Sequence, residues 1–152
     1  MRLFRFLSFA AIAMVISIAC YAAGARTVQL VSFDGNVEVK QSGQTSWIPA
    51  TMGMMIAEGD TVKTAPLSRA LLSIDDGKLA AVEVKEGSEM LISELKQGPE
   101  ADRSKTLLDL AMGEVLIKAQ KISSEDSKFE VKTPTSLVGV RGTTFSVKVD
   151  TI

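Results

Sequence analysis

The chain has 152 residues, of which 46% are hydrophobic and 23% charged, a composition typical of one globular domain and not of a disordered chain. Its 17 Lys and Arg nearly balance its 18 Asp and Glu, and no basic face or basic amphipathic helix is visible, which argues against nucleic acid as a partner and against adsorption to a membrane surface. With no His and a single Cys, it can form neither an internal disulfide nor a Cys-based zinc site, and it lacks the commonest general base.

The N-terminus has the pattern of an export signal. Arg2 and Arg5 give a positive start, the stretch from Phe6 to Ala25 carries no charge, and Ala23-Gly24-Ala25 fits a signal peptidase site. We therefore predict a signal peptide over residues 1–25, cleaved after Ala25, and one β domain over residues 26–152.

Two alternatives for this segment stay open. The uncharged stretch is long enough to be an uncleaved membrane anchor, since about 20 apolar residues span a bilayer. Cys20 follows Ala19, as in signals for lipid attachment. All three interpretations place the domain outside the cytoplasmic membrane, periplasmic or secreted, because the Arg residues stay inside. A membrane contact is expected only if the segment is retained or Cys20 is lipidated.

After residue 26 the chain alternates apolar and polar residues, the period of a half-buried strand. Strands are predicted at Thr27–Val31, Val37–Lys40, Ala70–Ile74, Leu79–Val84, Glu89–Leu95, Glu114–Ala119, Phe129–Lys132, Ser136–Arg141 and Phe145–Asp150. Thr106–Met112 is predicted as a further strand, with a short helix as the alternative.

The segments between these strands have turn chemistry. Asp-Gly pairs at Phe33–Asn36 and Asp75–Lys78 predict hairpins, because Gly accepts the positive φ that such turns require. Glu58–Asp60 and Lys85–Gly87 predict further turns, and polar Gln97–Lys105, which contains Pro99, predicts an exposed loop. Short strands at this spacing indicate an all-β fold: a sandwich, a barrel or a solenoid.

Four motifs occur in order along the chain. They are Gly59-Asp60-Thr61-Val62-Lys63-Thr64, then Ser68–Gly77 with its apolar strand and Asp-Gly, then Leu110–Val115, and last Thr133-Pro134 leading into Val140-Arg141-Gly142-Thr143-Thr144-Phe145. Together, over residues 30 to 150, they resemble the FecR domain.

The resemblance implies an all-β domain of β-solenoid or β-roll type outside the cytoplasmic membrane; a β-sandwich is the alternative. In the namesake, this domain relays the state of an outer-membrane siderophore receptor to a cytoplasmic sigma factor. Here only five residues precede the apolar segment, and the chain stops at Ile152. We therefore expect fold and compartment to carry over better than the regulatory role. The signature positions, structural or partner-binding, are Gly59, Asp60, Thr64, Gly77, Gly113, Thr133, Pro134, Val140, Arg141, Gly142, Thr143 and Phe145.

Several residues have both a functional and a structural interpretation. Arg141 is either a partner anchor or a tie between neighbouring turns, and we favour the tie because Gly142 permits a close backbone approach. Asp60 is expected to bond its own turn, and Asp75 and Asp76 to form a solvated turn. The remaining interpretations are core packing for Met52, Met54 and Met55, and an exposed contact or a partly buried strand end for Trp47.

No nucleophile, phosphate or dinucleotide motif is present. We therefore expect a non-enzymatic protein with no cofactor and no metal, which binds an envelope protein in sensing or scaffolding. The alternative is a structural module associated with cell-wall glycan. Whether the C-terminal strand Thr143–Val149 is an edge that accepts a partner strand stays open.

Overall fold

The computed structural model describes residues 26–98, 103–121 and 127–150. The predicted signal peptide and its cleavage site after Ala25 lie outside the described residues. The described part contains strands and no helix, so the prediction of an all-β fold is confirmed. Accordingly, a helix long and apolar enough to cross a membrane is not found in it.

Twelve strands make up the described part, in the following order along the chain. They are β1 Val28–Asp34, β2 Val37–Lys40, β3 Ile48–Pro49, β4 Met55–Ile56, β5 Thr61–Thr64, β6 Arg69–Ile74, β7 Ala80–Val84, β8 Glu89–Gln97, β9 Ser104–Ala119, β10 Lys128–Lys132, β11 Leu137–Gly139 and β12 Thr144–Val149.

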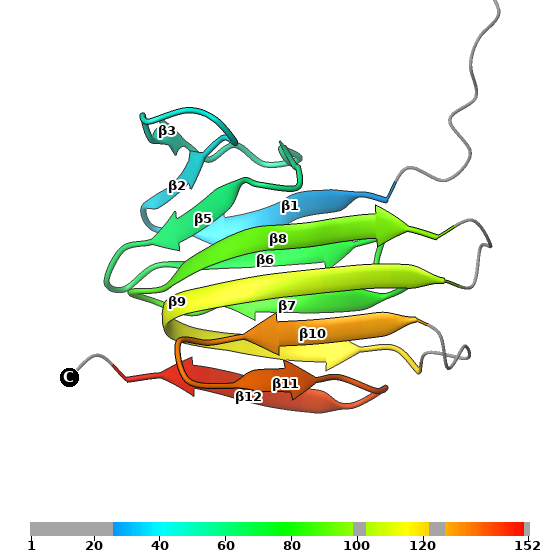
Figure 1. Cartoon of the computed structure of the whole chain (residues 1–152). Helices are drawn as coiled ribbons and strands as arrows, with labels where there is room; N and C mark the ends of the chain where they lie inside the picture. Colours follow the sequence, from blue (N-terminus) through cyan, green and yellow to red (C-terminus); the bar gives the residue numbers. More distant parts are fainter. Residues whose placement is uncertain (1–25, 99–102, 122–126, 151–152) are drawn as a thin grey trace, which may run out of the picture.

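The strands form one open sheet that curls over on itself into two layers (Figure 1). The β8 layer holds β3, β2, β5, β8, the first half of β9, β10 and β11. The β6 layer holds β4, β1, β6, β7, the second half of β9 and β12. The layers are continuous because β9 pairs with β8 and β10 before Gly113 and with β7 and β12 after it.

Neighbouring strands run antiparallel, apart from β9 and β10, which are parallel. This pairing makes a curled antiparallel sheet, and the β-solenoid or β-roll is not confirmed by it.

Alternation along each strand builds the core between the layers. In β7, for example, Ala80, Val82 and Val84 are fully buried while Ala81 and Glu83 are partly exposed. The largest fully buried side chains come from both layers and pack into one cluster: Phe129, Leu30, Leu72, Ile74, Met90, Ile92, Leu108, Leu110 and Ile117. Burial of this apolar surface is the main source of stability in a domain without disulfides.

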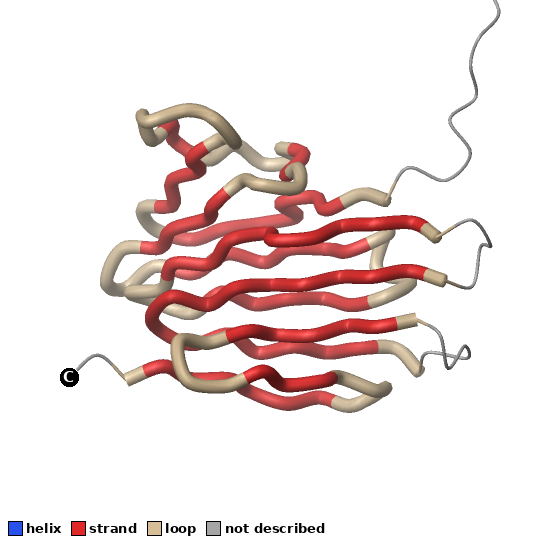
Figure 2. Tube along the Cα trace, viewed as in Figure 1, coloured by secondary structure: helices blue, strands red, loops and turns tan. Residues whose placement is uncertain are grey.

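Four times the chain passes from one layer to the other at the same end of the molecule. We call these crossings arches, and their common end the arch end; they lie at Asp34–Asn36, Ala65–Ser68, Lys85–Ser88 and Met112–Glu114. In Figure 2 the first three are short loops that join strands of different layers, and the fourth is a bend within the continuous strand β9. The second and third arches continue into similar sequences, Ser68–Ser73 (SRALLS) and Ser88–Ser93 (SEMLIS).

The arches correct one sequence prediction. Asp75–Lys78 does form a hairpin, since β6 and β7 pair directly. The hairpin predicted at Asp34-Gly35 is wrong, because β1 pairs with β6 while β2 pairs with β5 in the other layer. Gly35 and Gly77 both have positive φ, as the turn signal requires. The signal does not decide with which strand the next strand pairs.

Other boundaries also shifted. The predicted loop Gln97–Lys105 is shorter, because Gln97 ends β8 and Ser104 begins β9; residues 99–102 within it lie outside the described residues. Thr106–Met112 is confirmed as strand, within β9. The short strands β3, β4 and β5 were not predicted.

Candidate partner-binding face

The arch end is held together by Ser side chains that fill the space beside Gly residues. Gly35 and Gly113 have φ of +78° and +88°, and a Cβ on either would lie 3.1 Å or less from the Cα of Ser68 or Ser88. The close approach of Ser68 to Gly35 also lets the Ser68 hydroxyl accept a hydrogen bond from the Asn36 N–H at 2.9 Å. Adjacent arches therefore stack on one another, and only Gly fits against them.

Ser88 has the same role in the third arch. Its hydroxyl accepts from the Glu114 N–H at 2.9 Å and donates toward the Glu114 carbonyl at 3.2 Å. Its own N–H donates to the Thr64 hydroxyl at 3.0 Å, and this hydroxyl donates to the Lys85 carbonyl at 2.5 Å. Three successive arches are thus joined by buried and partly buried hydrogen bonds, which makes this end rigid.

Leu67 lies at the tip of the second arch in a strained conformation. Its φ is +58°, a region that costs a residue with a side chain about 1–2 kcal/mol. Its side chain is 90% exposed, the highest value among the exposed large apolar residues described. The Glu86 carboxylate holds the loop by accepting from the Leu67 N–H at 2.7 Å.

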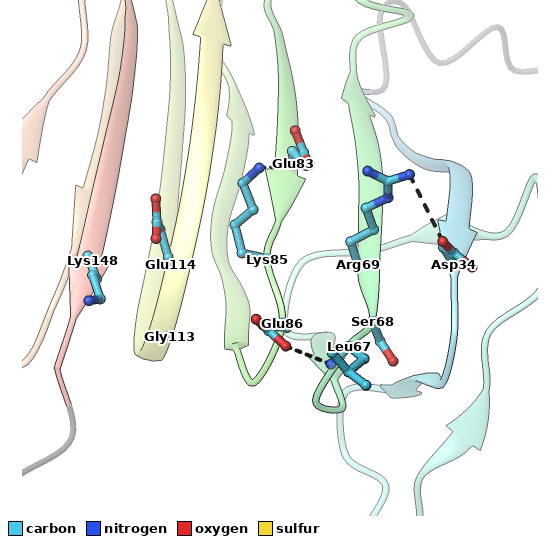
Figure 3. Close-up of a pocket in the computed structure, with 10 residues that line it drawn as sticks. All are labelled: Asp34, Leu67, Ser68, Arg69, Glu83, Lys85, Glu86, Gly113, Glu114 and Lys148. Carbon is cyan, nitrogen blue, oxygen red and sulfur yellow. Dashed lines mark hydrogen bonds and ion pairs between the residues drawn. The ribbon is translucent and has the colours of Figure 1, made fainter.

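Beside Leu67 a row of charged side chains crosses the outer surface of the β6 layer (Figure 3). The row runs Lys148 on β12, Glu114 on β9, Lys85 directly after β7, Arg69 on β6 and Asp34 on β1, and signs change along most of it. We call this set, with Leu67, the arch face. It lines an open depression of about 740 Å³.

The charges of the arch face are only loosely paired. Lys85 bonds Glu83 at 2.9 Å, whereas Arg69 and Asp34 are 4.0 Å apart and both exposed. The hydrogen bond from Lys148 to Asp150 raises the pKa of the Lys148 ammonium. Exposed pairs of this kind contribute little to stability, so these charges remain available to a partner.

The predicted signature positions do not form one site. Thr64 and Gly113 lie at the arch end. Gly59 and Asp60 lie before β5, where the Asp60 carboxylate accepts from the Ala57 N–H at 2.9 Å and the Ser42 N–H at 2.8 Å. Asp60 is thus bonded to its own turn and to a second loop.

The remaining signature positions also lie in turns or strands. Gly77 is in the β6–β7 hairpin at φ +77°. Thr133 precedes Pro134 in the β10–β11 turn, where its hydroxyl accepts from the Ser136 N–H at 3.0 Å. Four more signature positions lie in the β11–β12 connection or in β12, and each has a contact within the fold. Val140 is buried, Gly142 approaches Lys121, the Thr143 carbonyl accepts from the Ala119 N–H, and Phe145 packs against the core.

Arg141 differs from these neighbours because its side chain is exposed. It has no hydrogen bond or ion pair with any residue that the structure describes, and it lines a shallow depression with Lys128 and Glu130. The close approach that Gly142 permits is present, since a Cβ there would lie 2.9 Å from the Lys121 Cα. A tie through the Arg141 side chain is not seen.

Two other predictions were wrong in part. Met52 and Met55 are 72% and 55% exposed, so their assignment to the core is wrong, while Met54 does pack against it. Asp75 is not merely a solvated turn residue, because it binds the buried Arg26 guanidinium at 2.7 Å.

Trp47 is partly buried just before β3. The ammonium groups of Lys40 and Lys63 lie 4.9 and 5.3 Å from its ring centroid. The isolated Trp was visible in the sequence, but its lysine neighbours come together only when β2 pairs with β5.

Groups of three or more His, Cys, Asp or Glu side chains that could hold a metal ion do not occur within the described ranges. The arch face offers charged side chains and one exposed apolar side chain, which are means of binding a protein surface.

The family model described as FecR protein matches residues 60–151, more than half of the chain. The chain belongs to the FecR family. Comparison with curated proteins and with solved structures gives no match. FecR domains are regulatory signalling domains that are typically associated with the envelope. The matched part of this FecR chain begins at β5 and contains the last three arches, with Leu67, Thr64 and Gly113.

Proposed function

We propose that this chain is an exported, non-enzymatic FecR-family protein that binds another envelope protein in signal sensing or scaffolding. In this proposal residues 1–25 direct export and are removed after Ala25, and the domain that follows works in the periplasm. The arch face is the binding surface. Leu67 is the observation that carries the proposal.

Leu67 supports binding because neither its exposure nor its backbone benefits the isolated domain. An exposed Leu gains nothing from the hydrophobic effect, and a positive φ costs free energy that Gly or Asn would avoid. Strained residues that persist in a rigid surround are characteristic of functional surfaces. The row of charges beside it resembles the polar part of a protein interface that borders an apolar contact.

In-cell crosslinking tests this proposal. The native protein is crosslinked, recovered by affinity and analysed by mass spectrometry, together with Leu67→Asn. Asn tolerates positive φ, so this variant should be as stable as the parent or more stable. We expect recovery of one envelope protein from the parent chain and about tenfold less from Leu67→Asn, as for loss of a central apolar contact.

Met52→Asn is the matched control, because Met52 is also exposed but lies in the loop before β4, beside the start of β1 and away from the arch end. It should leave recovery unchanged. Equal recovery with Leu67→Asn and the parent would show that the arch face is not the binding surface. Absence of any crosslinked protein would contradict the binding role itself.

A second candidate function rests on Trp47. A Trp ring beside Lys40 and Lys63 combines stacking surface with positive charge, which suits a glycan carrying carboxylates. This would make the protein a wall-associated module. Co-sedimentation with purified peptidoglycan, lost in Trp47→Ala but kept in Leu67→Asn, would favour this function over the first.

A further inference from the structure

The edges of the two layers differ sharply in length. Four strands lie at edges in the described part of the chain, and three of them are very short: β3 and β4 have two residues each and β11 has three. The fourth, β12, has six residues and pairs only with β9. Proteins usually blunt or cover long edges, because a long free edge accepts other strands.

The unpaired groups of β12 can be assigned from its register. Thr143 and Ala119 face each other, and the Ala119 N–H donates to the Thr143 carbonyl at 3.1 Å. In an antiparallel pair, alternate residues bond the neighbour, so Phe145, Val147 and Val149 point their main-chain groups toward β9. The N–H and C=O groups of Thr144, Ser146 and Lys148 therefore point to the open edge.

The side chains of β12 also suit an added strand. Thr144, Ser146 and Lys148 are exposed on the outer surface. Phe145 and Val149 pack against the core but remain partly exposed at its margin, with Val147 buried between them. A strand laid along β12 would cover this margin.

We propose that β12 pairs antiparallel with β12 of a second copy, with Ser146 facing Ser146 across a two-fold axis. In this register each Thr144 faces Lys148 of the second copy, and about six main-chain hydrogen bonds form. Each Phe145 faces Val147 of the second copy, an aromatic and β-branched pair that stabilises antiparallel sheets. No two like charges face each other directly, and the β6 layers of both copies become one sheet.

This self-association goes beyond the proposed function, since it uses an edge and not Leu67. Two-fold pairing places the same strand on both sides of the interface, as a symmetric dimer requires. A partner with a different sequence would not need β12 to be self-complementary in this way.

Sedimentation equilibrium of the protein expressed from its full-length coding sequence tests the dimer. Ser146→Pro removes an N–H that points to the open edge and no main-chain bond to β9, so the fold should persist. The hydrogen bond from the Ser146 hydroxyl to the Glu114 carboxylate is lost in Ser146→Val as well, which makes Ser146→Val the matched control. We expect a concentration-dependent dimer for the parent and for Ser146→Val, which keeps the N–H. In Ser146→Pro the Kd should rise about tenfold or more, while Leu67→Asn leaves it unchanged.

A disulfide trap decides the register and replaces this test if Ser146→Pro fails to fold. Facing residues in a hydrogen-bonded pair have Cα atoms about 5.5 Å apart, within the range of a disulfide. Ser146→Cys should therefore give an oxidised dimer that the parent does not give, and Thr144→Cys should not, since it faces Lys148. A monomer at every concentration, or equal crosslinking of the two Cys variants, would overturn the proposal.

Discussion

Gly113 and Ser88 approach so closely that a Cβ on Gly113 would lie 2.5 Å from the Ser88 Cα. The contact forms where β9 leaves one layer and enters the other, beside the arch that joins β7 to β8. Gly113 also has φ of +88°, which residues with a Cβ rarely adopt. The bend in β9, and with it the curl of the whole sheet, therefore depends on a missing side chain.

Gly113→Ala should lower the free energy of unfolding by about 3 kcal/mol, because the unfavourable φ adds to a backbone clash that cannot relax. Urea unfolding followed by circular dichroism measures this. Gly43→Ala is the matched control: Gly43 has φ of +75°, but nothing lies within 4 Å of its added Cβ. Its cost should be about 1 kcal/mol. Equal losses would contradict the packing explanation.

Two buried Thr residues should respond in opposite ways to the same substitution. Thr64→Val leaves the Ser88 N–H without its 3.0 Å acceptor and should cost about 2 kcal/mol. The Thr106 hydroxyl is buried in β9 and has no hydrogen-bond partner among the residues that the structure describes. Thr106→Val should therefore raise stability by about 1 kcal/mol. Thermal unfolding of both variants checks the signs, and destabilisation by Thr106→Val would mean that the hydroxyl is satisfied.

Asp75→Asn should lower the free energy of unfolding by about 3 kcal/mol, because it leaves a buried guanidinium without its counter-charge. The Arg26 side chain is only 3% exposed, and Asp75 accepts from both its Nε and a terminal nitrogen. Asp76→Asn is the control, since Asp76 has nearly the same positive φ but is exposed. Chemical unfolding should separate the two variants clearly, and similar small losses would argue against a strong pair.

Glu94 should make stability depend on pH in the acid range. The hydrogen bond from Lys105 lowers the pKa of the Glu94 carboxyl below its ordinary value of 4.5. The folded carboxyl therefore binds its proton less readily than the unfolded one. Its contribution to stability is complete above pH 4.5 and is lost as the pH falls through the lowered folded value. Urea unfolding of the parent and of Glu94→Gln should differ at pH 7 and converge in acid.

Lys96 and Lys105 face each other across β8 and β9, and Glu94 lies between them. Glu94→Gln also leaves the two lysines facing each other without a carboxylate between them. We therefore expect Glu94→Gln to be less stable than the parent at neutral pH. In a Lys105→Gln background, Glu94→Gln should have a smaller effect with little pH dependence. An unchanged effect in that background would assign the loss to something other than this pair.

Period-two alternation was enough to locate most strands, because a strand at the surface of a core must turn every second side chain inward. Ala80–Val84 and Phe129–Lys132 are examples in which the predicted and observed strands nearly coincide. The family resemblance likewise rested on local motifs, and its last three all lie within residues 60–151, where the family model matches. These are properties of short segments, which the residues in each segment determine.

Pairing was decided only by the tertiary structure. Asp34-Gly35 and Asp75-Asp76-Gly77 carry the same turn signal, yet one leads into the other layer and one folds back on its neighbour. Which outcome occurs depends on Ser68 packing beside Gly35, a contact between residues far apart in the chain.

The candidate site depended on the same long-range contacts. Nothing near Leu67 in the sequence marks its positive φ, which is held by Glu86 from the next arch, and the charged row exists only because five strands are in register. Likewise Met52 has an apolar side chain typical of a core residue, but this side chain is exposed in the loop before β4. The sequence by itself determined which segments are strands and which are turns, because these follow from local chemistry. The order of the strands, the exposed face and the free edge of β12 were decided by packing between distant segments, which local chemistry does not specify.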